Sequence, residues 1–141
     1  MLLKNKNINK NINKNIYDIH INGVIELKLK DFKYNNHTLY IKNKYFKEKI
    51  GFILFYTPWC KFCKKLSELY TELALSNLNL FYFGAVNCDD VHNKNDKLCN
   101  YGNILKYPTL KYINKDGSLT NYEYEYNIDN LIYFINTKIN E

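Results

Sequence analysis

The fold is decided by residues 51–76, which read GFILFYTPWCKFCKKLSELYTELALS. The first six residues, Gly51–Tyr56, are apolar without alternation, which predicts a strand buried on both faces. After Cys60 the apolar residues recur every three or four positions, so we expect a helix whose buried face holds Phe62, Leu66, Leu69 and Leu73. Cys60 and Cys63 therefore lie where a buried strand gives way to a helix.

A pair of cysteines at such a junction suits thiol–disulfide exchange. The N-terminus of a helix presents unpaired N–H groups and a partial positive charge, which favour a thiolate over a thiol. Lys61 adds a cation beside Cys60, and Cys63 follows about one helical turn later, within reach of a disulfide. We expect Cys60 to be the nucleophile and Cys63 to resolve the mixed disulfide. A permanently closed or metal-bound pair is the alternative.

Two motifs together resemble the thioredoxin superfamily, and within it the protein disulfide isomerase domains. They are F-Y-T-P-W-C-x-x-C-K at residues 55–64 and Tyr107-Pro108-Thr109-Leu110. The resemblance covers roughly residues 23–139 and implies a thioredoxin-like fold and no cofactor. It also implies that Trp59, Tyr107 and Pro108 bind substrate, with a cis bond before Pro108, although only about 5–6% of X–Pro bonds are cis. From the residues alone, Trp59 could be a core residue and Pro108 part of a plain turn.

The sequence departs from the family pattern at several positions. The family usually carries a buried acid six residues before the first cysteine, where this chain has Leu54, and isomerases pair it with a lysine, where this chain has Ala85. No basic residue occupies Tyr126-Asn127, where isomerases often place an arginine. Proton transfer at Cys63 would then depend on water or another group. The dipeptide Lys61-Phe62 leaves the direction of electron flow open.

The rest of the chain alternates strands with helices. Residues 24–30 alternate apolar and charged side chains from Ile25 on, which predicts a half-buried edge strand. By the resemblance Asp31-Phe32 leads into a first helix. From the residues themselves we expect a short helix or an irregular segment at 40–49. Further strands are expected at 80–87, 109–114 and 119–126, the last two joined by a hairpin at Asp116-Gly117, and further helices at 97–102 and 128–139. This order predicts an α/β fold with a mixed central β-sheet and helices on both faces, of which the thioredoxin-like fold is the named version.

Cys88 and Cys99 are a separate question. They resemble positions that some disulfide isomerase domains bridge, so we expect a structural disulfide, which would favour an oxidising compartment or particle. In a reducing compartment both would be free thiols. A four-cysteine zinc site is a weaker alternative, because the two pairs lack matched C-x-x-C knuckles. We therefore expect no metal, and we interpret His20, His37, His92 and Asp89-Asp90 as solvated.

Composition and charge limit the domain count and the partners. With 141 residues, 46% of them hydrophobic, the chain can bury one core. We expect a low-complexity Asn/Lys/Ile segment at residues 1–20, disordered or loosely attached, and a thioredoxin-like domain at 21–141. Residues 1–50 hold 11 Lys against 4 acidic residues, and the remainder is nearly neutral. Lysines without clustered arginine are poor evidence for a nucleic-acid site. No stretch has the roughly 20 apolar residues of a membrane helix, and no signal peptide is visible.

The sequence thus predicts a thiol–disulfide oxidoreductase of the disulfide isomerase or thioredoxin type, exchanging disulfides with protein substrates through Cys60 and Cys63. It needs no cofactor, and its electron donor or acceptor is not identified. We expect neither a membrane nor a nucleic acid as a partner, and the compartment stays open. The alternative is a catalytically weak binding or scaffold module with the same fold, which the absence of the acid at Leu54 and the lysine at Ala85 motivates.

Overall fold

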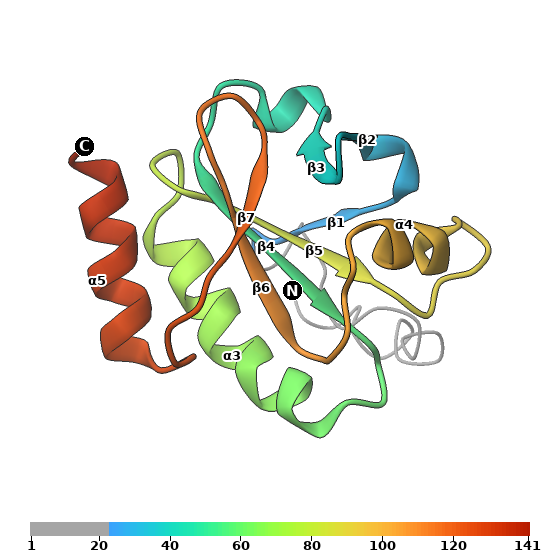
Figure 1. Cartoon of the computed structure of the whole chain (residues 1–141). Helices are drawn as coiled ribbons and strands as arrows, with labels where there is room; N and C mark the ends of the chain where they lie inside the picture. The colour runs from blue at the N-terminus through green and yellow to red at the C-terminus, as the bar shows by residue number, and fades with distance from the viewer. Residues whose placement is uncertain (1–22) are drawn as a thin grey trace, which may run out of the picture.

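A five-stranded sheet forms the centre of the computed structural model, which describes residues 23–141 (Figure 1). The segment 1–20 lies outside the described residues. The strand order is β1-β5-β4-β6-β7, in which β1, β5 and β4 are parallel and β6 and β7 are each antiparallel to their neighbour. The strands are β1 (Ile25–Leu27), β4 (Gly51–Tyr56), β5 (Tyr82–Asn87), β6 (Thr109–Ile113) and β7 (Leu119–Asn121). The predicted mixed sheet is confirmed.

Helices cover both faces of this sheet, as the sequence predicts. Helices α3 (Lys61–Ser76) and α5 (Ile128–Ile139) lie on one face, and α4 (Asn95–Tyr101) lies on the other (Figure 1). Successive residues of a strand point to opposite faces. In β4, therefore, Leu54 and its even-numbered neighbours enter the core beneath α3 and α5, whereas Ile53 and Phe55 enter the core beneath α4. This two-sided burial explains why the strand sequence is apolar without alternation.

The start of β4 also needs its glycine. A Cβ on Gly51 would lie 2.0 Å from the carbonyl oxygen of Tyr82, the residue that pairs with it in β5. Because that neighbour is backbone, it cannot move aside without breaking the parallel ladder. Because Gly51 has no Cβ, β4 and β5 can pair from Gly51 and Tyr82 onward.

Residues 29–46 differ from the prediction of a first helix. A short 3-10 turn, η1 (Leu29–Asp31), leads into the antiparallel hairpin of β2 (Phe32–Asn35) and β3 (Thr38–Ile41). Asn36 and His37 form its turn with φ of 50° and 64°, the left-handed backbone that a two-residue hairpin turn requires. The hairpin buries Phe32 and Leu39 against the α4 side of the sheet. For residues 40–49 a short helix or an irregular segment was expected; the chain there leaves β3 and is irregular apart from the 3-10 turn η2 (Lys44–Phe46).

Two further predictions were wrong in detail. The last strand was expected to reach residue 126, but β7 ends at Asn121, so the following chain is free to turn toward α5. Phe62 was expected on the buried face of α3, yet its side chain is 69% exposed. The buried face of α3 is instead formed by Cys63, Leu66, Tyr70, Leu73 and Ala74. The helix is thus rotated so that Cys63, and not Phe62, faces the sheet.

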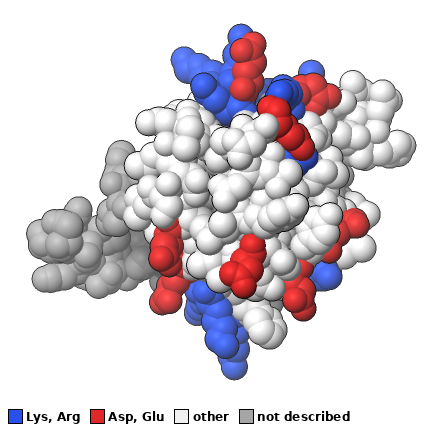
Figure 2. Space-filling view, turned by 90° about the vertical axis from the view of Figure 1, so that its left-hand side faces the viewer, with Lys and Arg blue, Asp and Glu red and all other residues white. Residues whose placement is uncertain are grey.

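Figure 2 shows the side of the molecule on which α5 lies. Uncharged residues occupy the middle of this side, and lysine and acidic side chains gather toward its upper and lower margins. Exposed Ile128, Ile132 and Tyr133 of α5 belong to the uncharged surface of the molecule. Among residues 23–141, none of the helices combines the length and the apolar character that crossing a bilayer requires.

Candidate functional site

Cys60 and Cys63 lie at the junction between β4 and α3. Cys60 is the N-cap residue of α3, with an extended backbone, and its Sγ accepts a hydrogen bond of 3.1 Å from the backbone N–H of Cys63. The sulfur thus occupies the place that an oxygen of Ser or Asp takes in an ordinary N-cap. Both the donated N–H and the helix dipole favour negative charge on an atom at this position.

The two thiols differ in their access to solvent. Cys60 is 7% exposed, whereas Cys63, in the first turn of α3, is fully buried. Burial, together with the hydrogen bond to Cys60, raises the pKa of the Cys63 thiol to about 12. At neutral pH Cys63 therefore keeps its proton, and only Cys60 can be reached from outside.

Trp59 stands on the surface beside the cysteines. Its side chain is 65% exposed, so the core-filling interpretation of Trp59 is wrong. The indole Nε1 donates a hydrogen bond of 2.6 Å to Oδ2 of Asp89, and the ring meets that of Tyr107 edge-on, with 6.2 Å between centroids. The peptide bond between Tyr107 and Pro108 is cis. The structure thus brings Trp59, which directly precedes Cys60, into contact with Tyr107 and the cis bond that follows it.

Asp89 is a residue of this site, although from the sequence it was expected to be merely solvated. It follows the carboxyl end of β5, and Trp59 follows the carboxyl end of the adjacent parallel strand β4. Because parallel strands end at the same edge of a sheet, this shared position is the signal that could have paired them. Burial, and then the charges of Asp89 and Cys63, raise the pKa of Tyr107.

A groove of about 530 Å³ is lined by Phe62, which lies between the two cysteines in the sequence. It lies between the first turns of α3, the segment that holds the cis peptide bond, and the chain just before α5. Most of its lining is apolar or aromatic, with two lysines among them. The lining residues are Phe62, Lys65, Leu66, Leu69, Lys106, Tyr107, Pro108 and Tyr126. A groove of this kind could accept an extended, largely apolar segment.

Tyr126 is the second residue that the sequence analysis did not assign to the site. Its phenol oxygen accepts a hydrogen bond of 2.9 Å from the backbone N–H of Leu110 in β6, which turns the ring back toward the sheet. Burial raises the pKa of Tyr126, the hydrogen bond from Leu110 opposes the rise, and the charge of Cys63 adds to it. The only signal in the sequence that could have found Tyr126 is its place at Tyr126-Asn127, where disulfide isomerases often carry an arginine and this chain has no basic residue.

Leu54 and Ala85 are both fully buried and are direct partners in the parallel pair of β4 and β5. Leu54 also pairs with Leu110 in β6, and Ala85 pairs with Glu26 in β1. These four residues form one row across the sheet, on the face that carries the cysteines. Glu26 lies at the far end of the row, where its carboxylate accepts a hydrogen bond of 2.8 Å from the hydroxyl of Tyr56. The middle of the row is therefore purely apolar.

Cys88 and Cys99 are joined by a disulfide, with a Cα–Cα distance of 5.9 Å. The bond ties the chain after β5 to α4 on the face opposite the Cys60–Cys63 pair. Since both sulfurs are used in this bond, they cannot complete a four-cysteine zinc site. Among the described residues no cluster of side chains suits a metal ion. His37 lies in the β2–β3 turn, His92 is exposed, and His20 lies outside the described residues.

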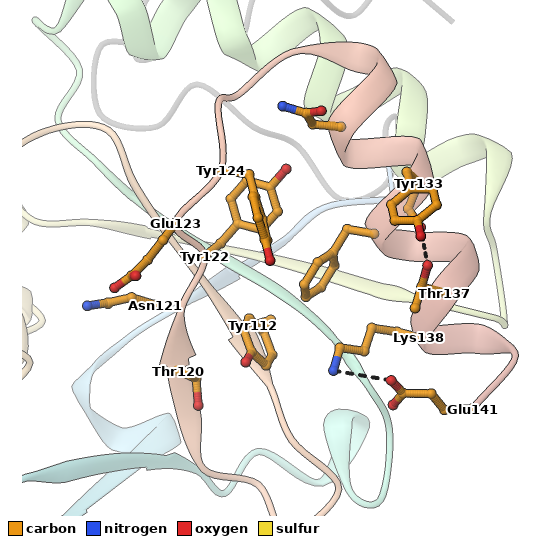
Figure 3. Close-up of a pocket in the computed structure, with 12 residues that line it drawn as sticks. Tyr112, Thr120, Asn121, Tyr122, Glu123, Tyr124, Tyr133, Thr137, Lys138 and Glu141 are labelled. Carbon is orange, nitrogen blue, oxygen red and sulfur yellow. Dashed lines mark hydrogen bonds and ion pairs between the residues drawn. The ribbon is translucent and has the colours of Figure 1, made fainter.

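A second groove, of about 830 Å³, lies between the β6–β7 strands and α5 (Figure 3). Tyrosines dominate it, and Lys138 at its edge forms an ion pair of 3.6 Å with Glu141. Neither the cysteines nor Trp59, Tyr107 and Pro108 line this groove. It is therefore separate from the site at the end of β4.

The sequence matches the Thioredoxin family over residues 28–137. The chain belongs to this family. It is 34% identical over 91 residues to protein disulfide-isomerase 1 of Dictyostelium discoideum, and 43% identical over 56 residues to protein disulfide-isomerase MPD1 of Saccharomyces cerevisiae. These matches cover 62% and 40% of this chain, which spans only 24% and 17% of the two relatives.

Solved structures of other thioredoxin-family proteins show the same fold. The J-Trx1 fragment of ERdj5 superposes with a TM-score of 0.67 at 22% identity, over 89% of this chain and 58% of that one. The zinc-bound form of human ERp44 gives a TM-score of 0.62 at 21% identity, over 82% of this chain and 31% of that one. The predicted thioredoxin-like fold is confirmed.

Proposed function

We propose that this thioredoxin-family chain is a thiol–disulfide oxidoreductase that exchanges disulfides with protein substrates through Cys60 and Cys63. The observation that carries the proposal is the placement of Cys60 as the N-cap of α3, with the N–H of Cys63 directed at its sulfur. This arrangement favours a thiolate and keeps a second thiol next to it. The relatives named as protein disulfide-isomerases agree with the assignment.

The reaction divides between the two sulfurs according to their burial. The thiolate of Cys60 attacks one sulfur of a substrate disulfide, that bond breaks, and the other substrate sulfur leaves as a thiolate. Cys63 then loses its proton and attacks Sγ of Cys60, which releases the second substrate sulfur and closes the Cys60–Cys63 disulfide. Two electrons pass from the dithiol to the substrate, and the reverse sequence oxidises a substrate dithiol. Only Cys60 has the access that the first step requires.

Trp59, Tyr107 and Pro108 are proposed to bind the substrate. The exposed indole ring and the apolar groove offer surface to an extended segment on either side of its cysteine. The backbone of Tyr107 can hydrogen-bond such a segment in the manner of an added strand. Protein thiols and disulfides are thus the proposed partners, together with an electron donor or acceptor that we do not name.

The disulfide between Cys88 and Cys99 supports an oxidising compartment or particle for this domain. Structural disulfides persist where glutathione and thioredoxin do not keep thiols reduced. The reaction itself needs no cofactor, because the electrons move between sulfur atoms of the protein and its substrate.

The experiment that tests this function follows insulin reduction and the refolding of scrambled ribonuclease. We expect activity in the unmodified protein and none in Cys60→Ser, since a serine hydroxyl cannot exchange disulfides. Cys63→Ser should still attack and should accumulate a mixed disulfide with its substrate, visible by mass spectrometry. Activity that survives Cys60→Ser would reject the proposal. A Cys63→Ser protein that forms no mixed disulfide would favour the scaffold module instead.

A further inference from the structure

The groove of about 530 Å³, which we call the cationic groove, combines apolar surface with two positive charges. Leu66 of α3 is buried in its lining, and Leu69 and Tyr126 are half-buried there. Among the described residues that line it, the charged side chains are Lys65 and Lys106, and both are exposed. The groove therefore offers contacts to apolar side chains together with two ammonium groups.

The covalent chain keeps the cationic groove close to the reactive sulfur. Phe62, which lines it, follows Cys60 by two residues, so their Cα atoms are at most about 8 Å apart. Lys65 follows Cys60 by five residues, in a helix that rises about 1.5 Å per residue. Tyr107 also lines the groove, and its ring meets that of Trp59, the residue before Cys60. A substrate segment whose cysteine reaches Cys60 can therefore extend into this groove within a few residues.

Neither lysine of the cationic groove is neutralised by an acidic side chain within residues 23–141. The lysine that forms an ion pair in this part of the chain is Lys138, with Glu141. Glu68 and Glu125 are the acidic residues adjacent in sequence to residues of the lining, yet neither of them lines the groove. Both positive charges are therefore available to a group that comes from outside the domain.

The larger groove between β6–β7 and α5 shows the opposite arrangement. Its lysine, Lys138, is paired with Glu141 and lies over the ring of Tyr112, 5.0 Å from the centroid. A second acidic residue lines the same groove. Among the described residues, Lys65 and Lys106 have neither an acidic partner nor an aromatic ring beneath the ammonium group. The chain thus satisfies the charge of one groove internally and leaves that of the other for a ligand.

We propose that the cationic groove selects substrate segments that carry an acidic side chain among apolar ones near the reacting cysteine, and that Lys65 and Lys106 determine this preference. The inference rests on the proposed function and names the class of protein substrate for the same site. An acidic side chain in the groove is attracted by both ammonium groups, while neighbouring apolar side chains leave water against Leu66 and Leu69. A basic segment would meet like charges instead.

The test measures the first step of exchange with three synthetic peptides. Each has a single cysteine among leucines, bonded in a mixed disulfide to 5-thio-2-nitrobenzoate, and the three differ only in carrying glutamate, glutamine or lysine beside the leucines. The thiolate of Cys60 attacks the peptide sulfur, the mixed disulfide breaks, and the nitrobenzoate sulfur leaves as a coloured thiolate. At neutral pH and low salt we expect the glutamate peptide to react about three- to ten-fold faster than the glutamine peptide. The lysine peptide should be the slowest.

The quantity to compare between variants is the ratio of the rate constants for the glutamate and glutamine peptides, because a change in the reactivity of Cys60 affects both equally. Lys65→Gln and Lys106→Gln should each lower this ratio, and the double variant should bring it close to one. Lys65→Glu/Lys106→Glu should reverse the preference toward the lysine peptide. The control is Lys64→Gln, which removes the same charge from the preceding, likewise exposed residue of α3 outside the lining. It should lower the ratio far less.

A salt series gives a second measurement on the unmodified protein, so the inference does not depend on the folding of any variant. The ratio should fall toward one as sodium chloride is raised from about 0.05 M to about 1 M, where charges are screened within about 3 Å. A ratio that does not respond to salt would overturn the inference. Circular dichroism establishes which variants are folded.

The remaining outcomes separate this inference from the function on which it rests. Equal rates for the three peptides at low salt would leave Cys60 as the nucleophile and overturn the selectivity. An equal fall of the ratio in Lys64→Gln and Lys65→Gln would also overturn it, because the charge would then act diffusely and not through the groove. A release of coloured thiolate no faster than that in Cys60→Ser would instead reject the proposed function, and this inference with it.

Discussion

The two cysteine pairs of this domain begin in equivalent places and end in different states. Cys60 follows β4 and Cys88 follows the adjacent parallel strand β5, and both are largely buried. Cys60 and its partner Cys63 are free thiols, whereas Cys88 is bonded to Cys99. Burial therefore does not distinguish a free thiol from a bonded one. What differs is the position of each pair relative to the helix that follows.

The helix position explains the contrast. Cys60 caps α3, so its sulfur receives a backbone N–H and lies at the positive end of a 16-residue helix. Cys88 precedes α4 by a loop, and Cys99 lies within that 7-residue helix, with no such donor directed at either sulfur among the described hydrogen bonds. Similar strand ends thus produce one site suited to exchange and one suited to cross-linking.

The largest expected effect on activity comes from replacing Cys60 with serine, compared with the same replacement in the Cys88–Cys99 pair. In Cys60→Ser the rate of insulin reduction should fall to the rate measured without the protein. The double variant Cys88→Ser/Cys99→Ser should retain most of the activity of the unmodified protein, because its bond lies on the opposite face of the sheet. Equal losses of activity in the two variants would show that disulfide exchange does not depend on the Cys60–Cys63 pair alone.

The free energy of unfolding should depend more on the Cys88–Cys99 pair than on the Cys60–Cys63 pair. The Cys88–Cys99 bond closes a loop of 11 residues, and the chain-entropy account assigns to such a loop about 3 kcal/mol of the free energy of unfolding. Urea unfolding of Cys88→Ser/Cys99→Ser should show this loss. The control is Cys60→Ser/Cys63→Ser, which removes two free thiols and keeps the Cys88–Cys99 bond, so its stability should differ from that of the unmodified protein with free Cys60 and Cys63 by far less. A smaller loss from the first variant than from the control would contradict the assignment.

The pairs should also differ in their response to alkaline pH. Burial, with the hydrogen bond to Cys60, raises the pKa of Cys63 from 9.0 to about 12, so the folded state favours the neutral thiol. This contribution is complete below pH 9 and is lost as the pH rises from 9 toward 12, at up to about 1.4 kcal/mol per pH unit. The reduced protein should therefore lose stability over this range more steeply than Cys63→Ala. The bonded pair contributes no such term, since its sulfurs do not titrate. If the free energy of unfolding depended on pH in the same way in both proteins, the pKa of Cys63 would not be raised in the folded state.

The contrast also shows which parts of the site a sequence can predict. The buried strand at Gly51–Tyr56 and the helix after Cys60 are local patterns, so their junction was predicted correctly. Asp89 and Tyr126 are hydrogen-bonded to partners 30 and 16 residues away, and no local pattern identifies such contacts. The β2–β3 hairpin was missed for another reason: the resemblance at Asp31-Phe32 suggested a helix, although Asn36 and His37 supply the turn.

The smallest of the expected effects concerns the hydrogen bond between Trp59 and Asp89. In Asp89→Asn the amide oxygen can still accept from the indole, so the orientation of Trp59 should persist while the charge is lost. Since Asp89 contributes to the raised pKa of Tyr107, that pKa should fall in the variant, which an ultraviolet titration of the tyrosines can detect.

Asp89→Ala removes the acceptor as well as the charge, and it therefore separates the two contributions. A hydrogen bond at an exposed position contributes about 1 kcal/mol or less, so the KM for a disulfide-bonded peptide should rise only a few-fold, with kcat nearly unchanged. If Asp89→Asn raises KM as much as Asp89→Ala does, the charge and not the orientation of Trp59 would matter for substrate binding. Asp89, at the end of β5, would then influence disulfide exchange through its charge. The end of β5 would in that case contribute to exchange as well as to cross-linking.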